Sequence, residues 1–187
     1  MIKLKKLGEL AEIRFGIHAA PFQQGKAEYL QVRQFNERGI KVSNSLDYID
    51  IDKKNESHLL QDGDVLFVGK GSRIFSWCYR QKDKPAIASS IFFVLRLNAN
   101  LVLPEYLTAI LNAPQSRAAF QLIGAGTNIL SIRKSELGAF EIPLPSMERQ
   151  ILIANVAQLH QKEVELAQQI IEQKQNLYTA LISNLIK

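Results

Sequence analysis

The sequence has few of the residues on which metal sites, disulfide-rich folds and membrane anchors depend. It contains one cysteine, Cys78, in 187 residues, which excludes an internal disulfide framework and a multi-cysteine zinc site. No apolar run approaches the roughly 18–20 residues of a membrane-spanning helix. The basic start of the chain also lacks the apolar core of a signal peptide. These absences predict a cytoplasmic protein without membrane contact.

The motifs of several enzyme classes are also missing. The three histidines have no paired spacing with one another or with Cys78, so no metal site is expected. Gly69-Lys-Gly71 is followed by neither the phosphate-loop nor the dinucleotide-binding pattern. Asp62 and Asp64 lack the further acid that would make Lys70 part of a metal nuclease. With no catalytic constellation and no cofactor motif, the sequence favours a binding module over an enzyme.

Positive charge is concentrated in one stretch of the chain. The net charge is +5, and residues 65–100 alone carry six basic side chains against Asp83, while the rest of the chain is balanced. A local basic excess is typical of proteins that bind a polyanion such as DNA, although a solvated surface without a ligand would look the same.

The chain divides at Pro143 and Pro145 into two parts of unlike composition. Before this point lie all ten glycines and all six prolines, with short β-rich runs such as Val65–Val68 and a helix opened by Pro104. After it, residues 146–187 hold no Gly or Pro and read as one long helix that Ser146 could cap. We therefore expect an α+β fold, with a strand-rich domain over residues 1–145 and a single long helix over residues 146–187.

The long helix carries apolar residues at heptad spacing. Such a seam is typical of a coiled coil, and a helix of this length cannot bury it against a domain packed at one end, although folding back onto its own domain stays an alternative. Leu159, Leu166, Ile170 and Leu177 widen the stripe on one side. The seam expected to pair with another helix consists of Ile153, Ala157, His160, Val164, Ala167, Ile171, Lys174, Tyr178, Leu181 and Leu185.

The basic stretch interleaves cations with Phe75, Trp77 and Tyr79. On a strand these aromatics would share one face and anchor it in the core, while basic residues at the ends would reach phosphates. Base readout needs side chains that pair with base edges, such as Arg with guanine or Gln and Asn with adenine. The candidate DNA-binding residues are Gln23, Gln24, Arg33, Gln34, Asn36, Lys70, Ser72, Arg73, Arg80, Gln81, Lys82 and Lys84.

Six short motifs follow one another along the chain. They are Lys6–Ile13 followed by Gly16, Tyr29–Arg33, Leu60–Leu66 with Gly69 and Gly71, Pro104–Leu107, Gly126-Thr-Asn with Leu130-Ser, and Ile142–Pro145 with Glu148, Gln150 and Ile153. Individually the motifs are weak, but their order and spacing together are specific. In this order the chain resembles the specificity (S) subunits of type I restriction–modification enzymes.

The resemblance implies a non-catalytic subunit that recognises double-stranded DNA. Such subunits typically hold two recognition domains, each followed by a long helix, and the helices pair antiparallel. They direct separate methyltransferase (M) and nuclease/translocase (R) subunits. This sequence contains one domain and one helix, so it resembles half of an S subunit and would pair as a homodimer or with another S-type chain. The alternative is a decoy that pairs through its helix without useful DNA contact.

Overall fold

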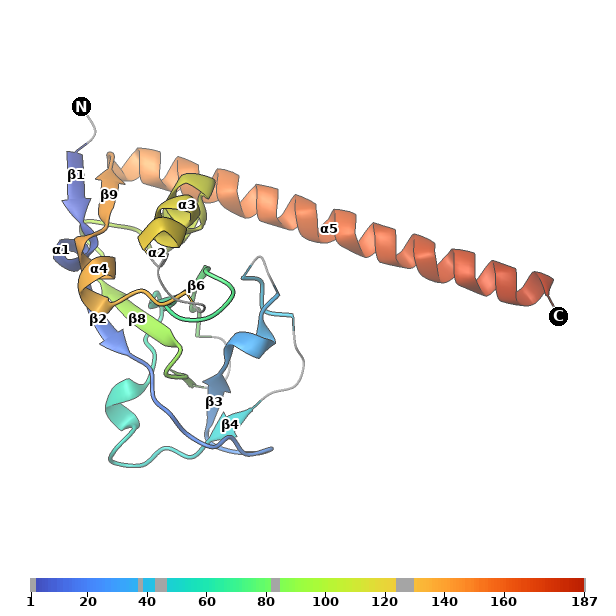
Figure 1. The fold of residues 1–187 in the computed structure, drawn as a ribbon, viewed down its shortest axis with the longest axis horizontal. Coiled ribbons are helices and arrows are strands. Elements are labelled where there is room, and N and C mark those ends of the chain that lie inside the picture. The colour runs from blue at the N-terminus through green and yellow to red at the C-terminus, as the bar shows by residue number, and fades with distance from the viewer. Residues whose placement is uncertain (1–2, 37–38, 43–46, 82–84, 124–129, 187) are drawn as a thin grey trace.

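The computed structural model describes residues 3–36, 39–42, 47–81, 85–123 and 130–186. Strands fill the first part of the chain, short helices cover them, and one long helix ends it (Figure 1). In chain order the elements are β1 (Lys3–Lys6), α1 (Leu7–Leu10), β2 (Ala11–Phe15), β3 (Ala27–Leu30), η1 (Val32–Gln34), β4 (Tyr48–Ile49), η2 (Glu56–His58), β5 (Val65–Val68), β6 (Ser76–Cys78), β7 (Ala86–Ala88), β8 (Phe92–Leu97), α2 (Pro104–Asn112), α3 (Pro114–Ile123), α4 (Lys134–Ala139), β9 (Glu141–Leu144) and α5 (Met147–Leu185).

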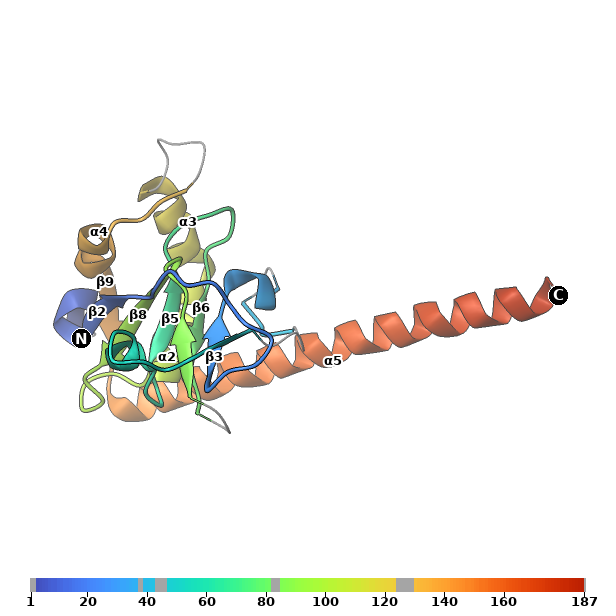
Figure 2. The ribbon, with the colours of Figure 1, turned by 90° about the horizontal axis from the view of Figure 1, so that it is seen from below.

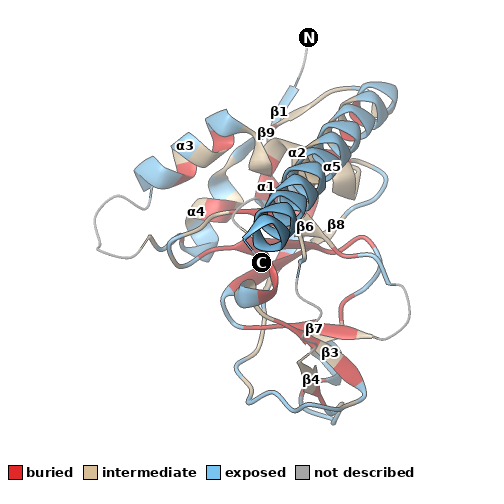
Figure 3. Cartoon of the chain, turned by 90° about the vertical axis from the view of Figure 1, so that its right-hand side faces the viewer, coloured by how far each residue is buried: buried red, intermediate tan, exposed pale blue. Residues whose placement is uncertain are grey.

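A four-stranded antiparallel sheet in the order β2-β8-β5-β6 forms the centre of the domain. Because side chains alternate along a strand, β5 buries Val65 and Phe67 on one face and Leu66 and Val68 on the other. The first face packs against α1, α2, α3, α4 and the start of α5. The second face packs against the segments around the smaller sheet β4-β3-β7, in which β3 and β7 run parallel. Figure 3 shows the buried residues gathered in these strands and in the helices packed on them, whereas α5 is exposed over most of its length.

The N-terminal strand holds the start of the long helix in place. β1 pairs antiparallel with β9, which directly precedes α5. Gln150, in the second turn of α5, is buried, and its carboxamide accepts the Leu103 N–H at 3.0 Å and donates to the carbonyls of Leu101 and Pro145. These bonds fix the direction in which α5 leaves the domain, and Figures 1 and 2 show it extending far past the sheets.

The predicted α+β fold is confirmed, with differences in detail. The strand over Val65–Val68 and the helix opened by Pro104 form as expected. The long helix begins after Ser146, but the serine side chain makes no capping hydrogen bond. Among the described helices, none is long and apolar enough to cross a bilayer.

Candidate nucleic-acid interface and pairing helix

The exposed residues predicted to read DNA lie in three different places. Gln23 and Gln24 follow Phe22, whose backbone pairs with Tyr48 of β4. Lys70 and Ser72 lie in the β5–β6 turn, beside residues 130–131. Arg80 and Gln81 follow β6 and contact Asp62. Lys82 and Lys84 lie outside the described residues. The set is therefore not gathered onto one surface.

The candidate DNA-binding residues around η1 make hydrogen bonds within the domain. Gln34 is 0 % exposed, and its carboxamide accepts the Gln31 N–H and donates to Asp47 and to a backbone carbonyl of β3. Arg33 donates to both oxygens of Asp47 at 2.7 Å. The carboxamide oxygen of Asn36 accepts a backbone N–H of the following turn at 3.0 Å. A base edge cannot reach Gln34 in this conformation, because the side chain has no exposed surface.

Two arginines of the basic stretch bind other parts of the domain. Arg73 donates to the backbone carbonyls of Phe35 and Val32, at 2.9 and 3.4 Å. Arg96 donates twice to Asp64, which is 2 % exposed. The hydrogen bond to Asp64 raises the pKa of the Arg96 guanidinium. Asp64 neutralises the charge of Arg96, whereas Arg73 keeps its charge but has its guanidinium held by backbone carbonyls.

Arg80 joins the end of β6 to α2. Its guanidinium donates to Asp62 at 2.6 Å and to Glu105 of α2, and the bond to Glu105 raises its pKa. The Gln81 backbone N–H, and to a smaller extent Arg80, lowers the pKa of Asp62. Arg80 thus meets two carboxylates on the side of β6 that faces α2, away from Lys70.

The alternation predicted for the aromatic run holds. Phe75, Trp77 and Tyr79 all pack in the core cluster on the second face of the central sheet. Cys78 points to the opposite side, where burial raises the pKa of its thiol to about 12. A thiol with such a pKa stays protonated at neutral pH, as expected of a structural cysteine.

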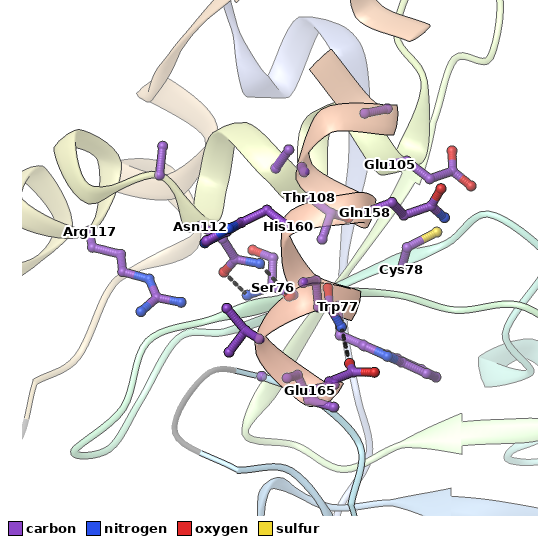
Figure 4. Close-up of a pocket in the computed structure, with 18 of the residues that line it drawn as sticks. Ser76, Trp77, Cys78, Glu105, Thr108, Asn112, Arg117, Gln158, His160 and Glu165 are labelled. Atoms are coloured by element: carbon purple, nitrogen blue, oxygen red, sulfur yellow. Dashed lines mark hydrogen bonds between the residues drawn. The ribbon is translucent and has the colours of Figure 1, made fainter. Parts of the chain in front are cut away.

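A hollow of about 740 Å³ lies where α5 diverges from β6 and α2. Its wall combines apolar atoms of Trp77, Ala154 and Val164 with the polar ends of Asn112 and Gln158 (Figure 4). Asn112 is already occupied, since its carboxamide bonds both the N–H and the carbonyl of Ser76. Within the described part of the chain, no group of three His, Cys, Asp or Glu residues could hold a metal ion.

The predicted seam of α5 changes its surroundings along the helix. Ile153 packs against the domain core, and Ala157 and Val164 are half-buried beside the hollow. The remaining seam positions, His160, Ala167, Ile171, Lys174, Tyr178, Leu181 and Leu185, are exposed. From Leu166 onward every described residue of α5 is exposed, whatever its face, because the helix has by then extended past the domain (Figure 1).

A neighbouring stripe on α5 is exposed from Leu152 to Leu177. It holds large apolar side chains that face away from the domain, and each is at least half exposed. Its members are Leu152, Val156, Leu159, Leu166, Ile170 and Leu177. Soluble monomers rarely leave so long an apolar face in water. This stripe includes the residues expected to widen the seam, and it stays exposed where the domain partly covers the seam positions Ile153, Ala157 and Val164.

The structure brings a second basic segment, absent from the sequence-based candidates, beside Lys70. Lys70 and Ser131 form an antiparallel bridge, and the exposed Arg133 and Lys134 follow at the start of α4. Arg133 occupies the N-cap position of α4, with its N–H bonded to Glu136 at 2.7 Å. In the sequence, the adjacent cations Arg133 and Lys134 give no indication that this segment lies beside Lys70, more than 60 residues earlier.

Solved structures with similar folds come from type I restriction–modification systems. The S subunit from M. genitalium superposes with a TM-score of 0.62 at 21% identity, over 92% of this chain and 42% of that one. The HsdS subunit from Thermoanaerobacter tengcongensis gives 0.60 at 20%, over 94% and 46%. A chain from a study of type I R-M complex assembly and conformational transition gives 0.65 at 20%, over 94% and 46%. This chain spans less than half the length of each.

The curated proteins contain no match to the sequence. The family model described as "Type I restriction modification DNA specificity domain" matches residues 2–174, which include the domain and most of α5. The fold agrees with this match, since the similar structures have the same strand-rich domain followed by a long helix. The chain therefore belongs to the family of type I restriction–modification DNA specificity domains.

Proposed function

We propose that this chain recognises one half of an interrupted DNA site and directs partner methyltransferase and nuclease subunits to it. The observation that carries the proposal is the family match over residues 2–174, which covers nearly the whole chain. The local excess of positive charge and the long exposed helix agree with it. In this proposal residues 1–145 form the recognition domain, and residues 146–187 form the pairing and assembly helix.

The apolar stripe of α5 supports pairing with a second S-type helix. A helix of 39 residues is about 58 Å long at 1.5 Å per residue. If two copies pair antiparallel, a twofold axis crosses the middle of the coil and the recognition domains lie at opposite ends. Identical domains would then read identical half-sites in inverted order, separated by a spacer that the coil length sets. Pairing with a different S-type chain would give two unrelated half-sites.

The alternative function is a decoy that pairs through α5 without useful DNA contact. The ion pairs of Arg80 and Arg96 within the chain favour it, because carboxylates of this chain already neutralise these two cations. Both functions need the helix, so only DNA binding separates them.

Selection from a pool of random DNA duplexes tests the proposed function. The purified protein, alone and with its methyltransferase subunit, is incubated with the pool, and the bound duplexes are sequenced. Recognition predicts enrichment of two short motifs at a fixed separation. Absence of enrichment under both conditions, with the protein folded and paired, contradicts recognition and supports the decoy.

A further inference from the structure

The β5–β6 turn presents one exposed cation on a rigid base. Lys70 lies between Gly69 and Gly71, and both glycines are required by geometry. A Cβ on Gly69 would lie 2.2 Å from the Phe93 ring, and Gly71 has a φ of +128°. Gly69 accepts the Ile132 N–H at 2.8 Å, and Gly71 donates to Leu130 at 3.0 Å. The two glycines and their hydrogen bonds therefore fix the conformation of the turn.

Among the described residues of the basic stretch, Lys70 is the exposed cation that is left for a ligand. Among the described residues it forms no ion pair, whereas Arg73, Arg80 and Arg96 bond to this chain. An exposed Lys without a carboxylate partner keeps its full charge for an external anion.

The bridge to Ser131 adds two more cations to the same surface. Arg133 and Lys134 are exposed and follow Ser131 within three residues. The Lys134 ammonium lies 5.8 Å from the centre of the Phe15 ring. The carboxylate near this group is Glu136, which is half-buried and accepts the Arg133 N–H. The surface therefore carries a net positive charge.

Two apolar side chains complete this surface. Phe15 at the end of β2 is 53 % exposed, with its ring 5.1 Å from that of Phe93. Ile91 is 43 % exposed, and its carbonyl accepts the Gly69 N–H. Large apolar side chains among unpaired cations fit DNA, because cations contact phosphates while apolar groups contact thymine methyls and sugars in a groove.

We propose that this surface, which we call the Lys70 platform, is the DNA-contacting face of the recognition domain; the proposal rests on the proposed function. Lys70, Arg133 and Lys134 contact phosphates and hold the domain in register on the duplex. Phe15 and Ile91 lie against the floor of the groove and contribute to the choice of bases. The platform consists of Phe15, Lys70, Ile91, Ser131, Arg133 and Lys134.

A charge-matched pair of variants tests the platform in the full chain. The platform variant carries Lys70→Ala, Arg133→Ala and Lys134→Ala. The control carries Lys6→Ala, Lys53→Ala and Lys54→Ala, which are exposed residues outside the platform. Both lose three positive charges. Duplex binding is followed by fluorescence anisotropy between about 50 and 200 mM salt, where phosphate contacts dominate the salt dependence, and thermal melting confirms folding.

The platform variant is expected to bind all duplexes about 100-fold more weakly, with the slope of log affinity against log salt shallower by roughly 2–3 units. The control should keep the wild-type slope. A third variant, Phe15→Ala, should keep that slope and lose about tenfold in preference for the selected sequence. Equal slopes in the platform variant, the control and the wild type overturn the platform alone. A wild-type protein that binds no duplex, with or without its methyltransferase, overturns the proposed function and the platform together.

Discussion

Truncation of two side chains in the exposed stripe of α5 should separate paired copies. Leu166 and Ile170 lie one turn apart near the middle of the helix and are 50 % and 53 % exposed. In an antiparallel homodimer both lie close to the twofold axis, so each copy contributes the same two side chains to the interface. The double variant Leu166→Ala with Ile170→Ala removes most of the apolar surface of these two side chains. Alanine has a helix propensity at least as high as that of leucine or isoleucine, so the helix itself should not be weakened.

The expected loss of pairing free energy follows from the exposed fractions of these two side chains. Full burial of a Leu or Ile side chain contributes about 1.5–3 kcal/mol, so covering the exposed half contributes about 1 kcal/mol for each side chain. Four such side chains meet in the dimer, and because alanine keeps its Cβ, the double variant should lose about 3 kcal/mol of pairing free energy. This corresponds to a roughly 100-fold weaker dimer.

Sedimentation velocity over a concentration series measures this loss. The matched control replaces Gln168 and Glu172 by alanine, since these exposed residues have the same four-residue spacing on another face of α5. The control should dimerise like the wild type, and far-UV circular dichroism should show equal helix content in both variants. A wild-type chain that stays monomeric alone and with the methyltransferase, or equal dissociation of the two variants, would refute the assigned pairing face.

Two further predictions concern the domain. Burial raises the pKa of the Cys78 thiol to about 12, whereas the thiol of the guanidinium-unfolded protein has a pKa near 8.5. Iodoacetamide at about pH 8.5 should therefore alkylate the folded protein far more slowly than the unfolded protein. Equal rates in a mass-spectrometric time course would contradict the burial of the thiol. Replacing the buried Asp64 by Ala leaves Arg96 unpaired and the Gln61 N–H without its acceptor. Urea unfolding should therefore show a free energy of unfolding lower by about 3 kcal/mol. A change below about 0.5 kcal/mol, the range of ordinary surface substitutions, would contradict this role of Asp64.

Much of the fold could be predicted because its signals are local. Val65–Val68 is a continuous apolar run after an Asp-Gly-Asp turn, and the structure buries it on both faces of the central sheet. Pro104 opens α2 because proline fits the first turn of a helix, where its missing N–H is not needed. The break after Pro145 separates two compositions, and α5 begins at Met147, two residues later.

The electrostatic partners could not be predicted, because they depend on pairing between distant segments. Arg96 meets Asp64 across the strands β5 and β8, and Arg80 meets Glu105 on α2, 25 residues away. A count of charges along residues 65–100 cannot reveal that these arginines are neutralised within the domain. The same long-range pairing brings Ser131, and with it Arg133 and Lys134, beside Lys70.

The pairing face of α5 stays a prediction, and the heptad pattern could not show which of its positions the domain covers. Ile153 packs in the domain core, whereas Ile171, five full turns further along the same face, is exposed. The difference arises because α5 extends past the domain, which depends on the arrangement of the whole fold. Whether α5 supercoils depends on the partner helix, and the sequence of one chain does not contain that information.

A map of methylated sites in cells that carry this protein with its methyltransferase tests the central claim most directly. Sequencing of genomic DNA that detects modified bases would reveal the recognised motif, and a strain without the protein provides the background. A homodimer of half-site readers predicts one interrupted motif whose halves are inverted repeats, and Leu166→Ala with Ile170→Ala should abolish its modification. Unchanged modification in the strain without the protein, or a modified motif without a gap, would contradict the account.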